Sequence, residues 1–126
     1  METKNIKLLK KHLIGKKIVD WSHSRIKLSD GTIVLVKETD QDCCASAGGG
    51  FENVTTEIII TDVALIKDEI IPGDNYEAEH EIVITLFHEE MTLANINMHA
   101  NNGNGGYYFS TSSIVADGVR LFDCSC

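Results

Sequence analysis

The stretch RIKLSDGTIVLV, residues 25–36, decides the fold class of this chain. RIKL alternates polar and apolar side chains with the period of two that a half-buried strand requires, and TIVLV is rich in the β-branched residues that strands favour. Between them stands Ser29-Asp30-Gly31, and an Asp-Gly pair between strand-like segments favours a tight turn. The stretch therefore predicts a β-hairpin, and with it an antiparallel sheet.

Upstream of this hairpin, residues 1–15 predict one short amphipathic helix. Its apolar row recurs at helical spacing: Ile6, Leu9 and Leu13. Thr3 is placed to cap the start of the helix and Gly15 to end it. From residue 16 the period changes to two, so residues 16–126 predict a β-rich body.

Downstream of the hairpin, the chain predicts further strands separated by turns. Residues 38–51, which include a glycine triplet, predict a loop. The expected strands are Thr55 to Ile66, Glu81 to His88, Thr92 to His99, Ser113 to Ala116 and Val119 to Phe122, with Pro72 in a connection and a turn over Asn101 to Gly106. The predicted class is α+β: one domain over residues 1–126, mainly an antiparallel β-sheet or sandwich with one short N-terminal helix.

Charge is distributed unevenly along the chain. The formal net charge is −8, yet residues 1–17 carry +5, so the remainder carries −13. This acidic balance argues against binding of long nucleic acid, which needs clustered Lys and Arg. A basic helix on an acidic body can dock on its own domain or on a second copy, with a solvated helix face as the alternative, and we expect a symmetric homo-oligomer. No segment is long and apolar enough to span a membrane, and we expect a cytoplasmic protein.

Histidines and cysteines show no recognisable catalytic or metal-binding pattern. The five histidines lack the HExxH spacing and no serine lies in a GxSxG motif. The four cysteines stand as the adjacent pair Cys43 and Cys44 and as Cys124-Ser-Cys126, which lack the spacing of a zinc knuckle. We therefore expect inert, buried thiols, no metal and no cofactor.

One segment is unusual because it carries no charge. Residues 91–116 contain no Asp, Glu, Lys or Arg and are rich in Asn, Ser, Thr and Tyr. In strand geometry Asn95 and Asn97 point away from the apolar row of the same strand, where an amide can donate and accept hydrogen bonds to a base or ribose. Phe87 is placed to offer a stacking face, with a core position as the alternative.

Two further residues complete the predicted ligand-binding set. Tyr107 belongs to the same uncharged segment, and Arg120 follows it closely. A guanidinium pairs well with phosphate oxygens, although a surface salt bridge to Asp117 or Asp123 is the alternative for Arg120.

Five motifs spread over most of the chain carry a resemblance to a known group of proteins. They are LIGKKIVDW (13–21), LSDGTIVLV (28–36), DCCA (42–45), ITDV (60–63) and GGYYFS (105–110). Together they resemble small phage proteins of the first class of Thoeris anti-defence proteins. That resemblance implies a sponge, which captures the cyclic ADP-ribose isomer made by a host TIR-domain enzyme and leaves it intact in the cytoplasm of the infected bacterium. It also implies dimers or hexamers, and for some members capture of cyclic oligonucleotides.

The resemblance also suggests roles for particular residues. In that family a Phe and an Asn ten residues apart hold the nucleotide, a separation that Phe87 and Asn97 repeat, and a C-terminal Arg contributes, which Arg120 matches. The family's central arginine has no counterpart between Arg25 and Arg120. Lys67 or a backbone nest is the expected substitute.

Two other functions remain open at this point. An inhibitor that mimics nucleic acid needs a contiguous acidic face, for which the candidates are Asp68, Glu69, Asp74, Glu77, Glu79, Glu81, Glu89 and Glu90. An enzyme that cleaves the signal needs a general base, for which His88 and His99 are the nearest residues.

Overall fold

The predicted hairpin is the start of a larger sheet in the computed structural model, which describes residues 6–126. Strand β2 (Arg25–Leu28) pairs antiparallel with β3 (Ile33–Gln41) around the predicted turn. In that turn Gly31 has a φ of +92°, and the Asp30 carboxylate accepts a hydrogen bond from the Thr32 N–H at 3.0 Å. The Asp-Gly pair thus supplies both the positive φ and the side-chain acceptor that the reversal needs.

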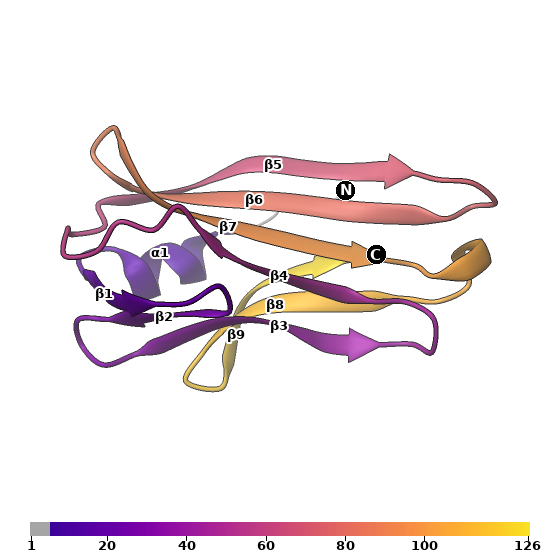
Figure 1. Cartoon of the computed structure of the whole chain (residues 1–126), viewed down its shortest axis with the longest axis horizontal. Coiled ribbons are helices and arrows are strands. Elements are labelled where there is room, and N and C mark those ends of the chain that lie inside the picture. Colours follow the sequence, from indigo (N-terminus) through magenta and orange to yellow (C-terminus); the bar gives the residue numbers. More distant parts are fainter. Residues whose placement is uncertain (1–5) are drawn as a thin grey trace.

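Within residues 6–126, nine strands form two antiparallel sheets (Figure 1). The five-stranded sheet has the order β1-β2-β3-β8-β9, and the four-stranded sheet has the order β4-β7-β6-β5. The remaining bounds are β1 Ile18–Trp21, β4 Ala47–Glu52, β5 Asp62–Pro72, β6 Ala78–His88, β7 Met91–Asn101, β8 Ser110–Ala116 and β9 Val119–Ser125, with a short 3-10 turn, η1, at Asn104–Gly106. The chain passes from one sheet to the other between β3 and β4 and again between β7 and β8. This confirms the predicted class.

The core lies between the two sheets and follows the period-two alternation of the strands. On β7 the side chains of Ala94, Ile96 and Met98 are buried. The neighbouring strands bury Ile82, Ile84 and Leu86 from β6, Phe51 from β4, and Val34 and Ile114 from the opposite sheet. From Ala94 onward β7 therefore sends every second side chain inward and leaves the others on the outer face, whereas β8 is buried at every position.

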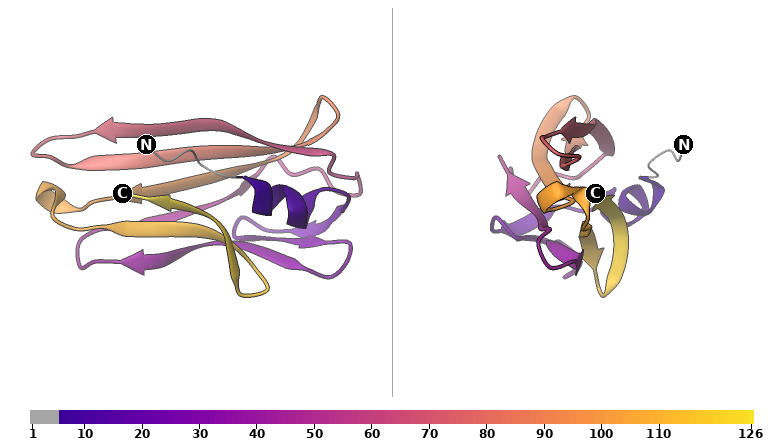
Figure 2. Two further views of the ribbon diagram at one scale, coloured as in Figure 1. Left: turned by 180° about the vertical axis from the view of Figure 1, so that it is seen from behind. Right: turned by 90° about the vertical axis from the view of Figure 1, so that its right-hand side faces the viewer.

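Helix α1 (Lys7–Leu13) closes one side of the sandwich, where it contacts β5 and β9, the edge strands of the two sheets (Figure 2). Leu9 and Leu13 are completely buried, and Lys10 forms an ion pair with Asp62 of β5 at 3.4 Å. The basic helix thus docks on its own acidic domain. Thr3, the expected cap, lies outside the described residues. No helix in residues 6–126 is long and apolar enough to cross a membrane.

The predictions for one loop and one strand were wrong. Most of the segment expected as a loop is strand, because β3 runs on to Gln41 and the glycine triplet lies within β4. The strand expected over residues 55–66 is instead β5, which spans Asp62–Pro72. Pro72 is therefore the last residue of this strand and not part of a connection. Glycine lowers the intrinsic preference for a strand, but the register of β4 against β7 outweighs it. Pro72 fits because it ends an edge strand.

Gly49 is the position on β4 where a side chain is least tolerable. Its φ is +151°, and a Cβ there would overlap the carbonyl oxygen of Asn97 and lie 2.9 Å from the Cα of Met98. We expect Gly49→Ala to lower the free energy of unfolding by about 1–3 kcal/mol more than Gly118→Ala. Gly118 is the matched control, since its φ is also positive, at +78°, but nothing lies within 4 Å of its added Cβ. Urea denaturation of both variants measures the difference, and equal losses would contradict the close approach.

Candidate functional site

The outer face of the four-stranded sheet carries the predicted asparagines. Asn95, Asn97 and His99 alternate along β7 with the buried Ala94, Ile96 and Met98, so all three point away from the core. Thr85 of β6 donates a hydrogen bond to the Asn95 side-chain oxygen at 2.9 Å. No such contact holds the Asn97 amide among residues 6–126. Asn97 is therefore the amide with its full hydrogen-bonding capacity available.

The glycines of β4 let two imidazoles lie against this face. Gly48 is the register partner of His99, whose ring lies 3.3 Å from where a Cβ on Gly48 would be. Gly50 is the partner of Asn97, and a Cβ there would overlap the ring of His23. His23 reaches this sheet from the turn between β1 and β2, where its carbonyl accepts a hydrogen bond from the Phe51 N–H at 2.7 Å.

Four residues thus form one polar strip, called here the outer-face row: His23, Asn95, Asn97 and His99. The sequence prediction contained only the two asparagines as ligand-binding residues, and it considered His99 only as a general base. His23 was missed because the other sheet contributes it. The glycine triplet was the available signal, since strand glycines often mark the close approach of another group.

A hollow of about 190 Å³ adjoins the outer-face row between β6 and β7. Its lining includes Asn97, His99, Glu79 and Glu81, and Glu81 lies directly across from His99. Lys67 of β5 contacts Glu81 at 2.7 Å, and this ion pair raises the pKa of Lys67. The hollow therefore offers carboxylate acceptors, one free amide and imidazole nitrogens close together.

The other predicted ligand-binding residues lie apart from Asn97. Phe87 is half-buried on β6, four residues along the strand from Val83, the register partner of Asn97. At about 3.3 Å per residue this separation is about 13 Å. Tyr107 is 87% exposed in the loop before β8. The structure places Phe87 and Asn97 in the same sheet without contact between them.

Arg120 lies on the five-stranded sheet. It is on β9, where it forms an ion pair with Asp40 at 3.1 Å, and neither Asp117 nor Asp123 is its salt-bridge partner. A hollow of about 280 Å³ lies beside it, with Lys37, Thr39 and Gly118 in the lining. Within one chain, Arg120 and Asn97 therefore belong to different sheets.

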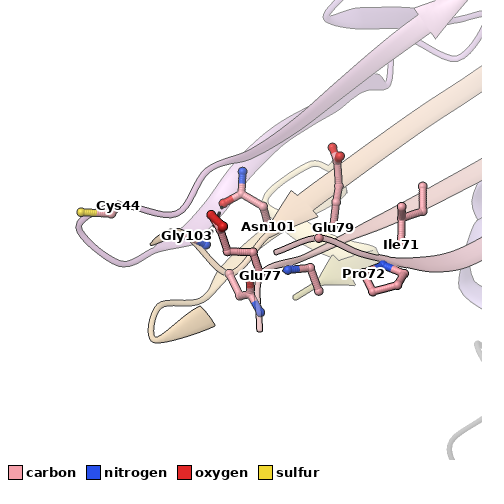
Figure 3. A pocket seen from close by; sticks show the side chains of 10 residues that line it. Cys44, Ile71, Pro72, Glu77, Glu79, Asn101 and Gly103 are labelled. Atoms are coloured by element: carbon pink, nitrogen blue, oxygen red, sulfur yellow. Dashed lines mark hydrogen bonds between the residues drawn. The ribbon is translucent and has the colours of Figure 1, made fainter. Parts of the chain in front are cut away.

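A larger hollow of about 350 Å³ lies at the tip of the β5–β6 hairpin (Figure 3). Asn101 and Asn102 line it, but their side chains already join the surrounding loops. The Asn101 oxygen accepts from the Ser46 N–H at 2.9 Å, and the Asn102 oxygen accepts from the Ala78 N–H at 2.8 Å. The charged residues that line this hollow are Glu77 and Glu79, and both are acidic. This hollow is therefore a poor site for an anion.

The acidic residues considered for nucleic-acid mimicry do not form one face. Asp74 and Glu77 lie at one end of the β5–β6 hairpin, while Glu89 and Glu90 lie at the turn after the other end of β6. Eleven residues of strand separate the two groups. The Asp68 carboxylate, moreover, contacts the buried ring of His80 at 2.5 Å.

Among residues 6–126, no serine or threonine hydroxyl is hydrogen-bonded to an imidazole ring. His88 directs its Nδ1 to the carbonyl of Ile59 at 2.8 Å. A chain of hydroxyls joins Thr39 to Ser113 at 2.7 Å and Ser113 to the Asp123 carboxylate at 2.5 Å, without an imidazole to accept the serine proton. Residues 6–126 also contain no group of three His, Cys, Asp or Glu side chains arranged for a metal.

The prediction that Cys43 and Cys44 are buried was wrong. Both are exposed in the loop after β3, with their sulfur atoms 3.5 Å apart, whereas Cys124 is buried. The Cys44 thiol raises the pKa of Cys43 and also that of Tyr108. A raised pKa lowers the thiolate fraction near neutral pH, so exposure here does not bring reactivity.

We expect Cys43 to react slowly with iodoacetamide at neutral pH and faster as the pH rises above the usual thiol range. The reason is that only the thiolate attacks, and the neighbouring Cys44 thiol raises the pKa of Cys43. Cys44→Ser removes that neighbour and should speed alkylation of Cys43. Mass spectrometry of the peptide gives the rates, with a free cysteine peptide as the reference. A rate at or above the reference would contradict this account.

The geometry can be set beside known proteins. No curated protein and no solved structure matches the chain. Residues 11–115 match a sequence family described as Domain of unknown function (DUF7448). This region runs from within α1 to β8 and includes all of β4, β6 and β7. It therefore contains the whole outer-face row, and the chain belongs to the DUF7448 family.

Proposed function

We propose that this protein binds and sequesters a cyclic ADP-ribose-type nucleotide signal without cleaving it, and that the ligand lies on the outer-face row. As a phage anti-defence protein it would act in the cytoplasm of the infected bacterium. The observation that carries the proposal is the Asn97 amide, which makes no side-chain hydrogen bond within residues 6–126, with His99 two residues along the same strand and His23 against Gly50, the register partner of Asn97.

The chemistry of this surface matches the parts of such a nucleotide. An amide donates and accepts in one plane, as the edge of a purine requires. Carboxylates such as Glu79 and Glu81 accept hydrogen bonds from ribose hydroxyls, as in other nucleotide sites. The N–H groups of His23 and His99 can donate to the pyrophosphate.

The positions of Arg120 and Lys67 decide which of them can contact a phosphate of the ligand. Arg120 is on the other sheet, so in one chain it is not the phosphate partner of a ligand at Asn97. Lys67 is a cation next to the hollow, because it contacts the lining residue Glu81. Lys67 therefore takes the place of the central arginine that the resembled family has and this chain lacks. Phe87 lies about 13 Å along the sheet from the level of Asn97, so it does not stack on a base that this amide holds.

Sequestration fits this surface better than cleavage does. A cleaving enzyme needs a base within hydrogen-bond reach of the reacting proton and a group that stabilises the developing charge. His99 is exposed and lies across from Glu81, and no serine or threonine hydroxyl of the described chain is hydrogen-bonded to its ring, since Ser112 donates to the His99 backbone carbonyl instead. Binding requires only the complementary hydrogen bonds that the surface offers.

We expect Asn97→Ala to weaken binding of cyclic ADP-ribose about ten- to a hundredfold, because a lost hydrogen bond that leaves ligand groups unpaired costs about 1–3 kcal/mol. His99→Ala should weaken binding in the same direction. Arg120→Lys is the matched control, since it changes an exposed polar residue on the other sheet and should leave binding unchanged. Titration calorimetry on folded variants measures all three. Loss of binding in Arg120→Lys with none in Asn97→Ala would move the site to β9.

The fate of the ligand separates the functions. We expect that heating the complex releases cyclic ADP-ribose with its mass and chromatographic retention unchanged. A shorter or linear product, formed at a rate that His99→Ala lowers, would show an enzyme instead. Absence of binding to cyclic ADP-ribose and to its isomers would refute the proposal and favour a protein-binding inhibitor.

A further inference from the structure

Three loops meet at the end of the sandwich where β3, β5 and β7 finish (Figure 1). They are called here the tip loops and comprise residues 42–46, 73–77 and 102–109. Two glycines mark where they touch. A Cβ on Gly103 would lie 2.9 Å from the Cys44 carbonyl oxygen, and a Cβ on Gly106 would overlap the Tyr76 carbonyl oxygen. The three loops therefore pack against one another as one surface.

The tip loops expose aromatic side chains. Tyr76 is 92% exposed, Tyr107 is 87% exposed and Phe109 is 49% exposed. Single exposed apolar residues are common, but aromatic side chains gathered on loops that touch are typical of a surface that binds another molecule. Tyrosine suits this purpose because it offers a large contact area with few rotatable bonds.

Tyr76 stands where glycine would be the usual residue. Asn75 and Tyr76 have positive φ, +53° and +67°, in a turn that the Glu77 N–H closes by donating to the Asp74 carbonyl at 2.9 Å. Turns with positive φ at both central residues favour Asn-Gly. The Asn102 side chain donates to the Tyr76 carbonyl at 3.2 Å and so holds this conformation. Because its ring is almost fully exposed, the tyrosine adds nothing to the core, and folding of the turn does not account for it.

Charge on the tip loops is entirely negative. Asp42, Asp74 and Glu77 lie in these loops, which contain no Lys, Arg or His. Glu77 and Glu79 are half-buried and line the hollow of about 350 Å³, and in Figure 3 both carboxylates point to the same side of the β5–β6 hairpin. Neither is part of an ion pair within residues 6–126. A half-buried carboxylate without a counter-charge favours a cationic partner.

We propose that the tip loops bind an extended, arginine-containing segment of another protein. One guanidinium of this segment lies in the hollow beside Glu77, with its methylene groups against Ile71 and Pro72. Neighbouring residues of the segment lie against Tyr76 and Tyr107. Arginine fits better than lysine because its planar guanidinium pairs with a carboxylate through two parallel hydrogen bonds and also stacks on a tyrosine ring.

The extent and the charge of the surface select this partner over other ligands. Tyr76 and Tyr107 do not line the hollow, so a ligand that contacts both the hollow and the tyrosines has to be longer than a small cation. Exposed aromatic loops can also contact an anionic membrane or a nucleic acid. The carboxylates of the tip loops repel both of these.

The test measures binding of a fluorescein-labelled peptide of alternating glycine and arginine to the full chain by fluorescence anisotropy. We expect binding of this peptide and none of its counterpart with glutamate in place of arginine. Glu77→Gln should weaken binding about five- to tenfold, because it removes a charge-assisted pair. Glu90→Gln is the matched control, since it makes the same change of charge in the turn at the other end of β6 and should bind like the parent.

A second pair of variants tests the aromatic contact without a change of charge. Tyr76→Gly should weaken binding about tenfold, as truncation of a contact tyrosine commonly does. Glycine adopts a φ of +67° without strain, so this variant should unfold at a temperature no lower than the parent does. Asn53→Gly is the matched control, because Asn53 also has a positive φ, +54°, and follows the end of β4 that is farther from the tip loops.

Failure of the parent chain to bind the arginine peptide overturns the proposal. So does binding that Glu77→Gln and Tyr76→Gly leave as tight as their controls, which would show attraction to the net charge alone. Vesicles that contain phosphatidylserine test a membrane surface, and we expect none of the chain to sediment with them. Sedimentation that Tyr76→Gly abolishes would replace the protein segment by a lipid surface. Neither Glu77 nor Tyr76 belongs to the outer-face row, so these outcomes leave the proposed nucleotide site unaffected.

Discussion

The structure depends on the burial of every second side chain of β7 and β6 between the two sheets. Ile96 and Ile84 are fully buried register partners at the centre of the four-stranded sheet. Because the period of a strand is two, a slip of one residue would move this whole apolar set into water. The same constraint fixes Asn97 and His99 on the opposite surface, so the core sets the position of the candidate site.

The glycine triplet connects the fold to that site. The three glycines of β4 have no side chain to bury, and the strand is held by Phe51 in the core, by β7 on one side and by the hydrogen bond from Phe51 to the turn that carries His23. The absence of side chains on Gly48 and Gly50 leaves room for the rings of His99 and His23. The glycines thus both lower the local preference for a strand and leave the polar surface beside them accessible.

The two outer faces of the sandwich differ in their charged residues. The β5–β6 hairpin presents Glu69, Glu79 and Glu81 around a single lysine, while Arg120 is paired with Asp40 on the other sheet. Because the surface of the β5–β6 hairpin is acidic, it suits the hydroxyl donors of a ligand better than its phosphates. A phosphate at the outer-face row has to rely on imidazole N–H groups and Lys67, or on cations from a second chain.

Sequence alone determined the class of the fold, because hairpin chemistry and period-two alternation are local properties. Neighbouring residues were enough to predict three features. These are the turn at Asp30 and Gly31, the apolar row of the helix with Leu9 and Leu13, and the outward direction of Asn95 and Asn97. Only the tertiary structure decided which sheet each strand joined, and that choice separated Arg120 from Asn97 and brought His23 beside Gly50. These contacts join residues distant in the chain, and neither spacing nor composition encodes the packing of one sheet on another. The glycine triplet was misassigned for the same reason, since the register with β7 that makes it a strand arises only when the sheet forms.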